Sequence, residues 1–284
     1  MELDEFVDYA ETHIDNRDYD SICEGARVLG ALANNRKFLV NAYNEDLVRY
    51  SRSELLGSYT PQSIRLSATE RFIIRANIWI PLSGDAKRRP LEESLYSYQT
   101  AHDHNFDFLT VGYLGSGYRT QIYEYDRQGI EGYPGEAVDL RFLEDTKLPH
   151  GKVMAFEAAR DIHTQLPPDE VSISINLLPL NPEKAARQQF FFDIERRCIE
   201  KFADDINNKR VSLVTMAGLL HDDNTIDILT DIAGRHSCAR TRAAAYAALM
   251  EACGDADGQL ADAIGRDPDQ RLASKVETQR KEFQ

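Results

Sequence analysis

The feature that most constrains this fold is a change of hydrophobic period along the chain. In the first 50 residues, apolar side chains such as Phe6, Ala10 and Ile14 recur at helical spacing. Residues 70–81 read ERFIIRANIWIP, in which β-branched and aromatic side chains alternate between two faces, as in a β-strand. After Asn181, which precedes a proline as at many helix starts, the pattern is helical again. A β-unit between two helical regions is therefore expected.

The same reading along the whole chain divides it into three parts. Helices are predicted at 20–33, 36–50, 182–207, 211–220, 225–234, 237–252, 255–264 and 267–281. Further strands are predicted at 95–111, 118–126, 138–143, 153–156, 161–165 and 171–178. Short strands separated by Gly and Pro turns are typical of sandwiches and barrels. We expect an α+β chain with an N-terminal helical segment (1–68), a β-unit (69–180) and an all-helical, HEAT-like C-terminal region (181–284), with a boundary near 58–67.

Composition excludes several classes of function. Lys and Arg number 33 against 47 Asp and Glu, a net charge of −14, so nucleic-acid and anionic-membrane partners are not expected. No apolar run approaches the roughly 18–20 residues that span a bilayer. The chain begins MELDEF, with acids where a secretory signal has a basic and then an apolar stretch, so no such signal is expected. Its four cysteines form no CxxC pair. A cytoplasmic protein with reduced thiols is expected.

Two of the seven histidines stand out. His102 and His104 flank Asp103 in a predicted strand that continues through Phe106 and Phe108. Because strand side chains alternate, the two imidazoles share one face about 7 Å apart and can reach one ion. The alternative, a polar outer face on an edge strand, would turn Asp103 and the next acidic and amide residues inward, which is costlier. We therefore expect His102 and His104 to be metal ligands.

A third ligand is expected from a neighbouring strand, and His163 is the candidate. His163 follows Gly151 and precedes the alternating stretch 172–176 (SISIN), while His102-Asp103-His104 forms an HxH pattern. This order resembles the two motifs of the cupin superfamily, over about residues 70–178, and is most similar to its cysteine-dioxygenase branch. The resemblance implies a cupin-type β-barrel or double-stranded sandwich in which three histidines hold Fe(II).

The resemblance is incomplete at one position. Many cupins carry a glutamate four or five residues after the second histidine, where this chain has Phe108 and Leu109. Asp107 lies close by, but alternation turns it away from the metal. Glu124, on the next predicted strand, is expected to face inward near Phe108. It is a candidate fourth ligand. The alternatives are that it contacts a ligand rather than the metal, or that it pairs with an arginine.

Three protein ligands leave open coordination positions, as catalytic metal sites require. Imidazole suits Fe, Zn, Cu and Ni, so residue type alone does not select the metal. A 2-oxoglutarate oxygenase is disfavoured because a histidine, His104, stands where that family has a carboxylate, and no arginine follows His163 before residue 187. The resemblance implies Fe(II), with substrate and O₂ bound side by side.

Four side chains are candidates for substrate binding. Arg75 lies in an apolar strand, where a guanidinium often binds a carboxylate through two parallel hydrogen bonds; an outward-facing surface arginine is the alternative. Tyr118 shares a face with Glu124 by alternation, Gln165 shares one with His163, and Tyr113 is a weaker candidate.

The leading prediction is thus a non-haem Fe(II) oxygenase acting on a small, amino-acid-like or carboxylate substrate, with O₂ as co-substrate. One alternative is a non-catalytic cupin that binds a ligand or regulates a partner. Another is an isomerase or hydrolase that uses a different divalent metal. The helical regions are expected to offer surfaces for a homo-oligomer.

Overall fold

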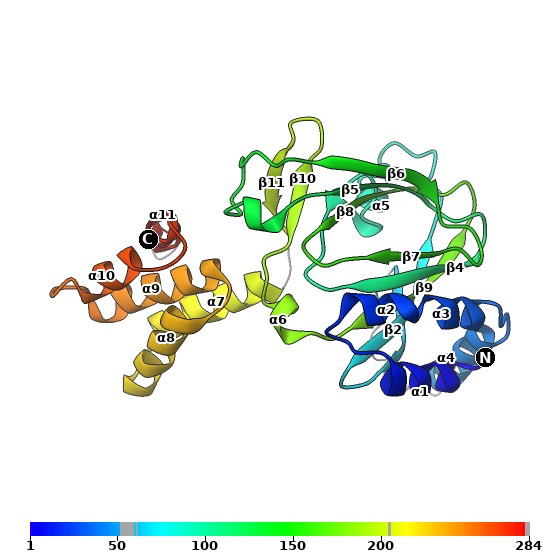
Figure 1. The fold of residues 1–284 in the computed structure, drawn as a ribbon, viewed down its shortest axis with the longest axis horizontal. Coiled ribbons are helices and arrows are strands. Elements are labelled where there is room, and N and C mark those ends of the chain that lie inside the picture. Colours follow the sequence, from blue (N-terminus) through cyan, green and yellow to red (C-terminus); the bar gives the residue numbers. More distant parts are fainter. Residues whose placement is uncertain (52–59, 61, 204–205, 282–284) are drawn as a thin grey trace.

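The fold is an α+β arrangement of two antiparallel sheets with helices at both ends of the chain, as expected (Figure 1). The structure is a computed structural model that describes residues 1–51, 60, 62–203 and 206–281. The expected boundary at 58–67 lies partly outside the described residues. No described helix is long and apolar enough to cross a bilayer.

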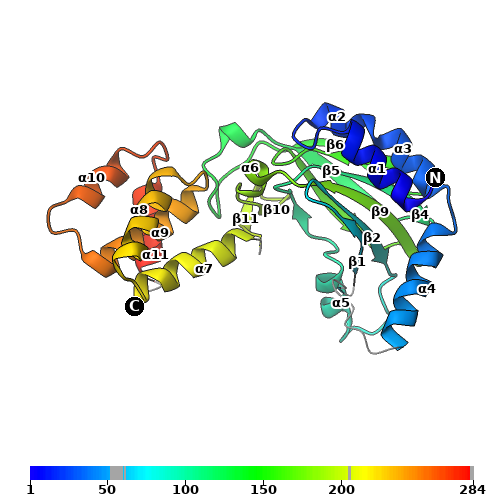
Figure 2. The same cartoon turned by 90° about the horizontal axis from the view of Figure 1, so that it is seen from below.

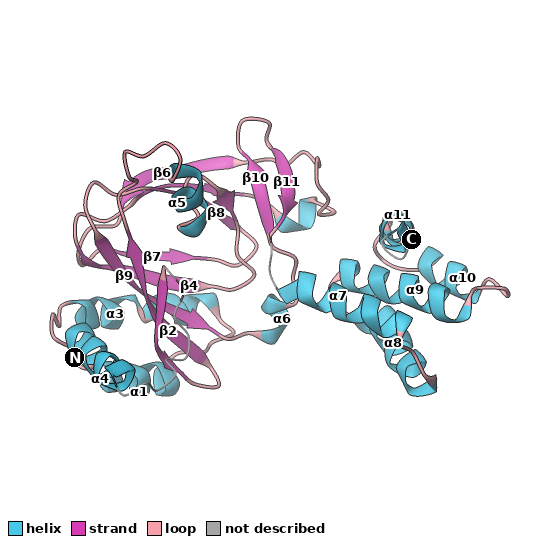
Figure 3. Ribbon diagram, turned by 180° about the vertical axis from the view of Figure 1, so that it is seen from behind, coloured by secondary structure: helices cyan, strands magenta, loops and turns pink. Residues whose placement is uncertain are grey.

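Each sheet joins strands from distant parts of the chain. One has the order β1 (Ser63–Ala68), β2 (Phe72–Trp79), β9 (Ser172–Pro179), β4 (Phe108–Leu114) and β7 (Val153–Phe156). The other has the order β11 (Cys198–Phe202), β10 (Phe190–Asp193), β3 (Ala101–His102), β8 (Asp161–Leu166), β5 (Arg119–Glu124) and β6 (Arg141–Lys147). The two sheets face each other, with the short helix α5 (Arg89–Leu95) near one end of the space between them (Figure 3).

The N-terminal helices cover the outer face of the five-stranded sheet (Figure 2). They are α1 (Leu3–His13), α2 (Tyr19–Glu24), α3 (Ala26–Ala33) and α4 (Phe38–Ser51). Phe6, Leu29 and Leu32 are fully buried in one cluster with Ile74 of β2 and Leu109 of β4. The helix predicted at 20–33 is two helices, which meet around residue 25.

Strand β2 is consequently covered on both sides. Phe72, Ile74 and Ala76 pack against the helices, whereas Trp79 belongs to a second cluster between the sheets. Arg75 lies four residues before Trp79 and so on the same face of the strand. It faces the space between the sheets and lines a cavity there. The helices bury the apolar face of β2, and the six-stranded sheet opposite makes the face that carries Arg75 an interior surface.

Several predicted boundaries were wrong. The sheet begins at β1, inside the segment expected to be helical, because β1 pairs with β2 along its length. The predicted strand 95–111 is the end of α5, then β3 and β4, separated by an irregular stretch. The predicted helix 182–207 ends at Ala185, since α6 (Pro182–Ala185) is followed by β10 and β11. The C-terminal region is therefore not all-helical.

Five helices follow β11 and form a lobe beside the sheets (Figure 1). They are α7 (Ile206–Leu219), α8 (Asp223–Arg235), α9 (Ala239–Cys253), α10 (Gln259–Gly265) and α11 (Leu272–Arg280). Helix α9 is buried on all sides from Thr241 to Leu249 and is the central helix of this lobe. The side chains of Arg242 and Asp267 form a buried ion pair inside this lobe (2.7 Å). HEAT-like stacking of these helices stays a prediction.

Candidate metal centre

Strand pairing brings two of the three histidines together. His102 ends β3 and is the register partner of His163 in β8, so both side chains lie on the same face of the sheet. On its other side β3 pairs with β10, where Phe191 is opposite His102. Residues 61 positions apart in sequence thus become direct neighbours between the sheets.

His104 reaches the same place from an irregular segment. Because β3 ends at His102, strict alternation does not extend to His104, and the continuous strand predicted through Phe108 is wrong. The carbonyl of His104 accepts a hydrogen bond from the N–H of Ala159 (2.8 Å), which fixes the backbone there. The two histidines converge because this segment bends.

Asp103 and Asn105, which alternate with the two histidines, are also buried, although strand alternation predicts that they point away from the interior. Asp103 accepts hydrogen bonds from the N–H of Phe190 (2.7 Å) and the hydroxyl of Tyr125 (2.6 Å). Burial raises its pKa to about 6. The amide of Asn105 donates to the carbonyl of Ala185 (3.2 Å). Buried polar groups are tolerated where they are hydrogen-bonded, and here the bonds go mainly to backbone.

The imidazole nitrogens converge on one point. The Nε2 atom of His163 lies 3.1 Å from Nε2 of His102 and 3.0 Å from Nε2 of His104. One ligand atom from each histidine lies within 4.8 Å of the others. Burial lowers the pKa of His102 and holds the pKa of His104 and His163 well below the usual value, so the rings are neutral at neutral pH.

Each neutral imidazole has one ring nitrogen whose lone pair can coordinate a metal, so three desolvated rings fit a divalent cation. The Nδ1 atom of His102 lies 2.9 Å from the carbonyl oxygen of Thr100, an arrangement that directs Nε2 toward the common point. The cluster thus could hold a transition metal through three histidines.

Next to the histidines lies a cavity of about 130 Å³. Arg75 lines it, and among the described residues no atom of its guanidinium has a hydrogen bond or an ion pair; its Nε is buried without an acceptor. Loss of solvation lowers the pKa of Arg75. No Asp or Glu is among the described residues that line this cavity, so its one formal charge is positive.

Two other candidates lie in the same cavity. Tyr118 is 2% exposed, and its ring lies 4.1 Å from that of Trp79; burial raises its pKa. The side-chain amide nitrogen of Gln165 lies 3.0 Å from Nε2 of His163. The Oε1 atom of Gln165 is buried without a hydrogen-bond partner. The structure therefore places Arg75, Tyr118 and Gln165 around the three histidines.

The remaining candidates lie elsewhere. The carboxylate of Glu124 forms ion pairs with Arg141 and with Arg160 (3.2 Å), so the arginine-pair alternative for Glu124 describes its contacts. Asp107 is buried, accepts the N–H of Ala158 (2.9 Å) and forms an ion pair with Lys184. Both carboxylates are outside the histidine cluster.

Tyr113 is also absent from the cavity. Its hydroxyl donates to the carbonyl of Asn35 (3.1 Å), and its ring packs against Phe38 under the N-terminal helices. Tyr113 belongs to the face of β4 that those helices cover.

The sequence reading missed a polar wall of the cavity. Thr110 of β4 donates to Asn176 of β9 (2.6 Å), and both residues are buried and line the cavity. The indole N–H of Trp79 donates to the hydroxyl of Ser174 (3.0 Å). The alternating Ser, Ser and Asn of the stretch 172–176 carried this signal, because polar residues on one face of an otherwise apolar strand indicate a polar interior.

No family model and no curated protein sequence matches this chain. Among solved structures, the chain is similar to DMSP lyases (14% identity over 45% of this chain and 56% of that chain, TM-score 0.27). It is also similar to hydroquinone 1,2-dioxygenase from Sphingomonas sp. TTNP3 (7% identity over 44% of this chain and 69% of that chain, TM-score 0.29). A third is a cupin domain from Bordetella pertussis (13% identity over 44% of this chain and 100% of that chain, TM-score 0.23). The similar structures thus include cupin-domain proteins, but TM-scores this low do not establish a shared overall fold.

Proposed function

We propose that this chain is a cupin-type, Fe(II)-dependent oxygenase whose substrate is a small molecule with a carboxylate group. The observation that carries the proposal is the position of Arg75, whose Nε is buried and whose guanidinium has no ion pair among the described residues, in the cavity that also holds three converging imidazoles. An iron ion bound by His102, His104 and His163 would supply open coordination positions for O₂ and substrate.

The cavity favours an anionic substrate on electrostatic grounds. A buried guanidinium without a counter-ion is costly, and a carboxylate that binds it in a bidentate manner removes that cost. The neutral ligands leave the positive charge of the metal uncompensated, which adds to the attraction for an anion. A volume of about 130 Å³ restricts the substrate to a small molecule.

The other cavity residues have separate roles in this proposal. The phenol of Tyr118, kept protonated because burial raises its pKa, is a hydrogen-bond donor toward the substrate. The side-chain amide of Gln165 lies against His163 and offers both a donor and an acceptor to a polar substrate. Trp79 and Phe108 provide apolar walls that exclude water.

Metal analysis tests the centre itself. Protein reconstituted with Fe(II) without air should bind about one iron per chain, and His163→Ala should lose it because one coordination bond is removed. His221→Ala is the control, since His221 is exposed and lies outside the cluster. Equal iron content in wild type and His163→Ala would refute the site.

Oxygen dependence separates the proposed activity from its alternatives. With a panel of small carboxylic acids, the iron-loaded protein should consume O₂ in proportion to substrate lost. Turnover that persists without O₂ would indicate an isomerase or hydrolase. Carboxylate binding without turnover in any metal form would indicate a binding or regulatory cupin.

The expected homo-oligomer stays a prediction. Leu213, Met216 and Leu220, in α7 and directly after it, are more than half exposed, which makes this part of the helical lobe the first surface to examine. Sedimentation of wild type and Leu213→Glu would test it.

A further inference from the structure

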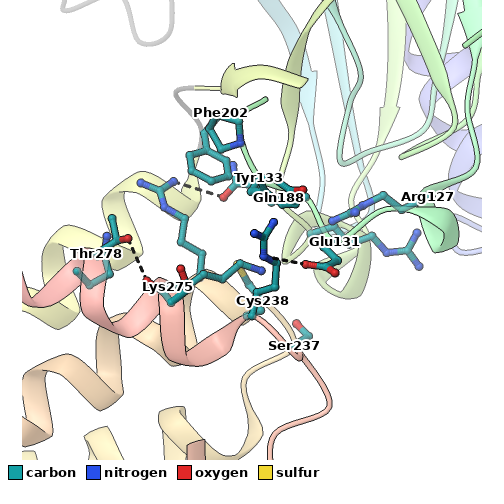
Figure 4. A pocket seen from close by; sticks show the side chains of 17 residues that line it. Arg127, Glu131, Tyr133, Gln188, Phe202, Ser237, Cys238, Lys275 and Thr278 are labelled. Carbon is teal, nitrogen blue, oxygen red and sulfur yellow. Dashed lines mark hydrogen bonds and ion pairs between the residues drawn. The ribbon is translucent and has the colours of Figure 1, made fainter. Parts of the chain in front are cut away.

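A larger cavity lies away from the histidines, where the helical lobe meets the β-unit. Its volume is about 330 Å³. The walls come from η1 (Arg127–Gly129) and the loop after it, the chain around residue 188, the start of α9 and one side of α11 (Figure 4). None of the three histidines lines this cavity, so the proposed metal chemistry does not use it.

The lining is strongly cationic for so acidic a protein. Five basic side chains line the cavity: Arg127, Arg187, Arg240, Arg271 and Lys275. Among the described lining residues the one acid is Glu131. Five positive charges against one negative charge make the lining cationic, even with Lys275 paired to Asp269 just outside it, in a chain whose net charge is −14. Such a concentration of one sign in a concave site attracts ions of the opposite sign.

Three of these arginines lie over aromatic rings. The distances from Cζ to the ring centroid are 3.7, 4.5 and 4.8 Å for Arg271 on Tyr133, Arg240 on Phe202 and Arg127 on Phe190. Stacking on a ring fixes the plane of a guanidinium and leaves the N–H groups at its edge able to donate. Two of these stacks join the helical lobe to the β-unit, so they also hold the cavity in shape.

The basic residues differ in how far they are neutralised. Arg271 forms an ion pair with Glu131 (3.2 Å), and Lys275 forms one with Asp269 (2.6 Å). Arg127 is half-buried and lies close enough to Asp103 to lower the pKa of that carboxyl, yet within the described part of the chain its guanidinium has no hydrogen-bond acceptor and no ion pair. An arginine held in place beside a cavity without an acceptor is a receptor for an oxyanion.

The start of α9 adds hydrogen-bond donors that carry partial positive charge. Ser237, Cys238 and Ala239 line the cavity, and the N-cap residue Cys238 makes no side-chain hydrogen bond to the helix. The first N–H groups of an α-helix carry partial positive charge. At α9 the N–H of Cys238 donates to His236 and that of Thr241 to the carbonyl of Cys238 (both 3.1 Å). Among the described residues, the N–H of Ala239 is left as a donor toward a ligand. Helix starts of this kind commonly bind phosphate.

We propose that this cavity binds a small molecule carrying a phosphate group. Arg127 and the first turn of α9 supply donors to the phosphate, while Tyr133 and Phe202 provide apolar surface for the organic part. A phosphate monoester carries a charge of roughly −1.5 to −2 at neutral pH, so it neutralises more of the positive charge of the lining than a single carboxylate does. Because the walls come from both parts of the chain, the ligand bridges them.

The test uses three probes that share one ring and differ in charge: phenyl phosphate, benzoate and phenol. Titration calorimetry should show binding that weakens in that order. Arg127→Gln should weaken phenyl phosphate about tenfold or more, because it removes a charge-assisted hydrogen bond. Arg235→Gln, an exposed arginine on α8, is the control and should bind like wild type.

A second variant leaves the stacking contacts intact. Thr278→Glu adds a negative charge at the exposed rim of the cavity and should weaken phenyl phosphate but not phenol. Thr230→Glu is the matched control, since both threonines are exposed on a helix and donate to the carbonyl four residues earlier (3.0 Å and 2.8 Å).

Three outcomes would overturn the proposal. The first is phenol binding as tightly as phenyl phosphate, or benzoate doing so in the Arg75→Met variant, which lacks the proposed carboxylate anchor of the other cavity. The second is unchanged phenyl phosphate binding in both Arg127→Gln and Thr278→Glu. The third is loss of binding in His163→Ala, which would place the probe at the histidine cluster instead.

Discussion

Replacing Arg75 with methionine should stabilise the substrate-free protein. The guanidinium of Arg75 lacks any hydrogen bond or ion pair among the described residues, and no acid lines its cavity. A buried donor without a partner costs about 1–3 kcal/mol, and methionine has a similar length without charge or polar N–H groups. We therefore expect Arg75→Met to raise the free energy of unfolding by about 1–3 kcal/mol. The same variant should weaken a carboxylate substrate at least about tenfold, since that charge is the proposed anchor.

Denaturant unfolding measures the first effect. The midpoint should rise with an unchanged slope, because the surface exposed on unfolding is the same in both proteins. Arg65→Met is the control: Arg65 is the register partner of Arg75 on β1 but is exposed, so its replacement should change stability by less than about 0.5 kcal/mol. Iron content should equal that of wild type, because guanidinium is always charged and cannot ligate a cation.

A lower unfolding midpoint for Arg75→Met would refute this reasoning. It would mean that packing of the arginine stem outweighs desolvation of its charge. Loss of iron in the same variant would contradict the assignment of Arg75 to the substrate and make it a structural support for the histidines.

Three further substitutions probe the scaffold and the site. Gly117→Ala should destabilise by about 1–3 kcal/mol in thermal unfolding, because φ is +78° and the new Cβ would lie 1.9 Å from the carbonyl oxygen of Leu148. Asp107→Ala should cost about 3–5 kcal/mol by the same measurement, since it leaves Lys184 without its buried partner; a cost below 1 kcal/mol would contradict this. Glu124→Gln should leave iron content unchanged in elemental analysis and change stability by less than about 1 kcal/mol, because its ion pairs lie near the surface; loss of iron would restore it as a ligand.

Local pattern was enough for the elements whose own residues decide them. The strand predicted at 153–156 has the same bounds as β7, and the predicted bounds of β2 and β9 differ from the observed ones by at most two residues at each end. Alternation also identified the residues of β2 that share a face with Arg75. The spacing of His102 and His104 and the later position of His163 singled out the three histidines that the structure brings together.

Elements that depend on distant partners were missed. The cap at Asn181 and the following proline predict a helix that runs through residues 190–193 and 198–202, but α6 lasts a single turn. The strands that follow exist because β10 pairs with β3 on one side and β11 on the other. The hydrogen bonds between β10 and β3, which lies about 90 residues earlier in the chain, leave no local pattern, so period and capping could not reveal that pairing.

The sequence by itself determined which residues lie on the same side of each strand, because alternation is a property of the extended backbone. It did not determine which side is covered, and the histidine pair joins through a bend rather than through alternation. Only the tertiary structure decided that the N-terminal helices cover one face of β2 and that the six-stranded sheet lies opposite the other face. That second sheet makes Arg75 the one formal charge among the described residues that line an interior cavity. Likewise, strand pairing puts Glu124 opposite Asp161, two residues from His163 on β8, and there Arg141 and Arg160 form ion pairs with it. Burial and ion pairing depend on what packs from elsewhere in the chain, and that information is not local.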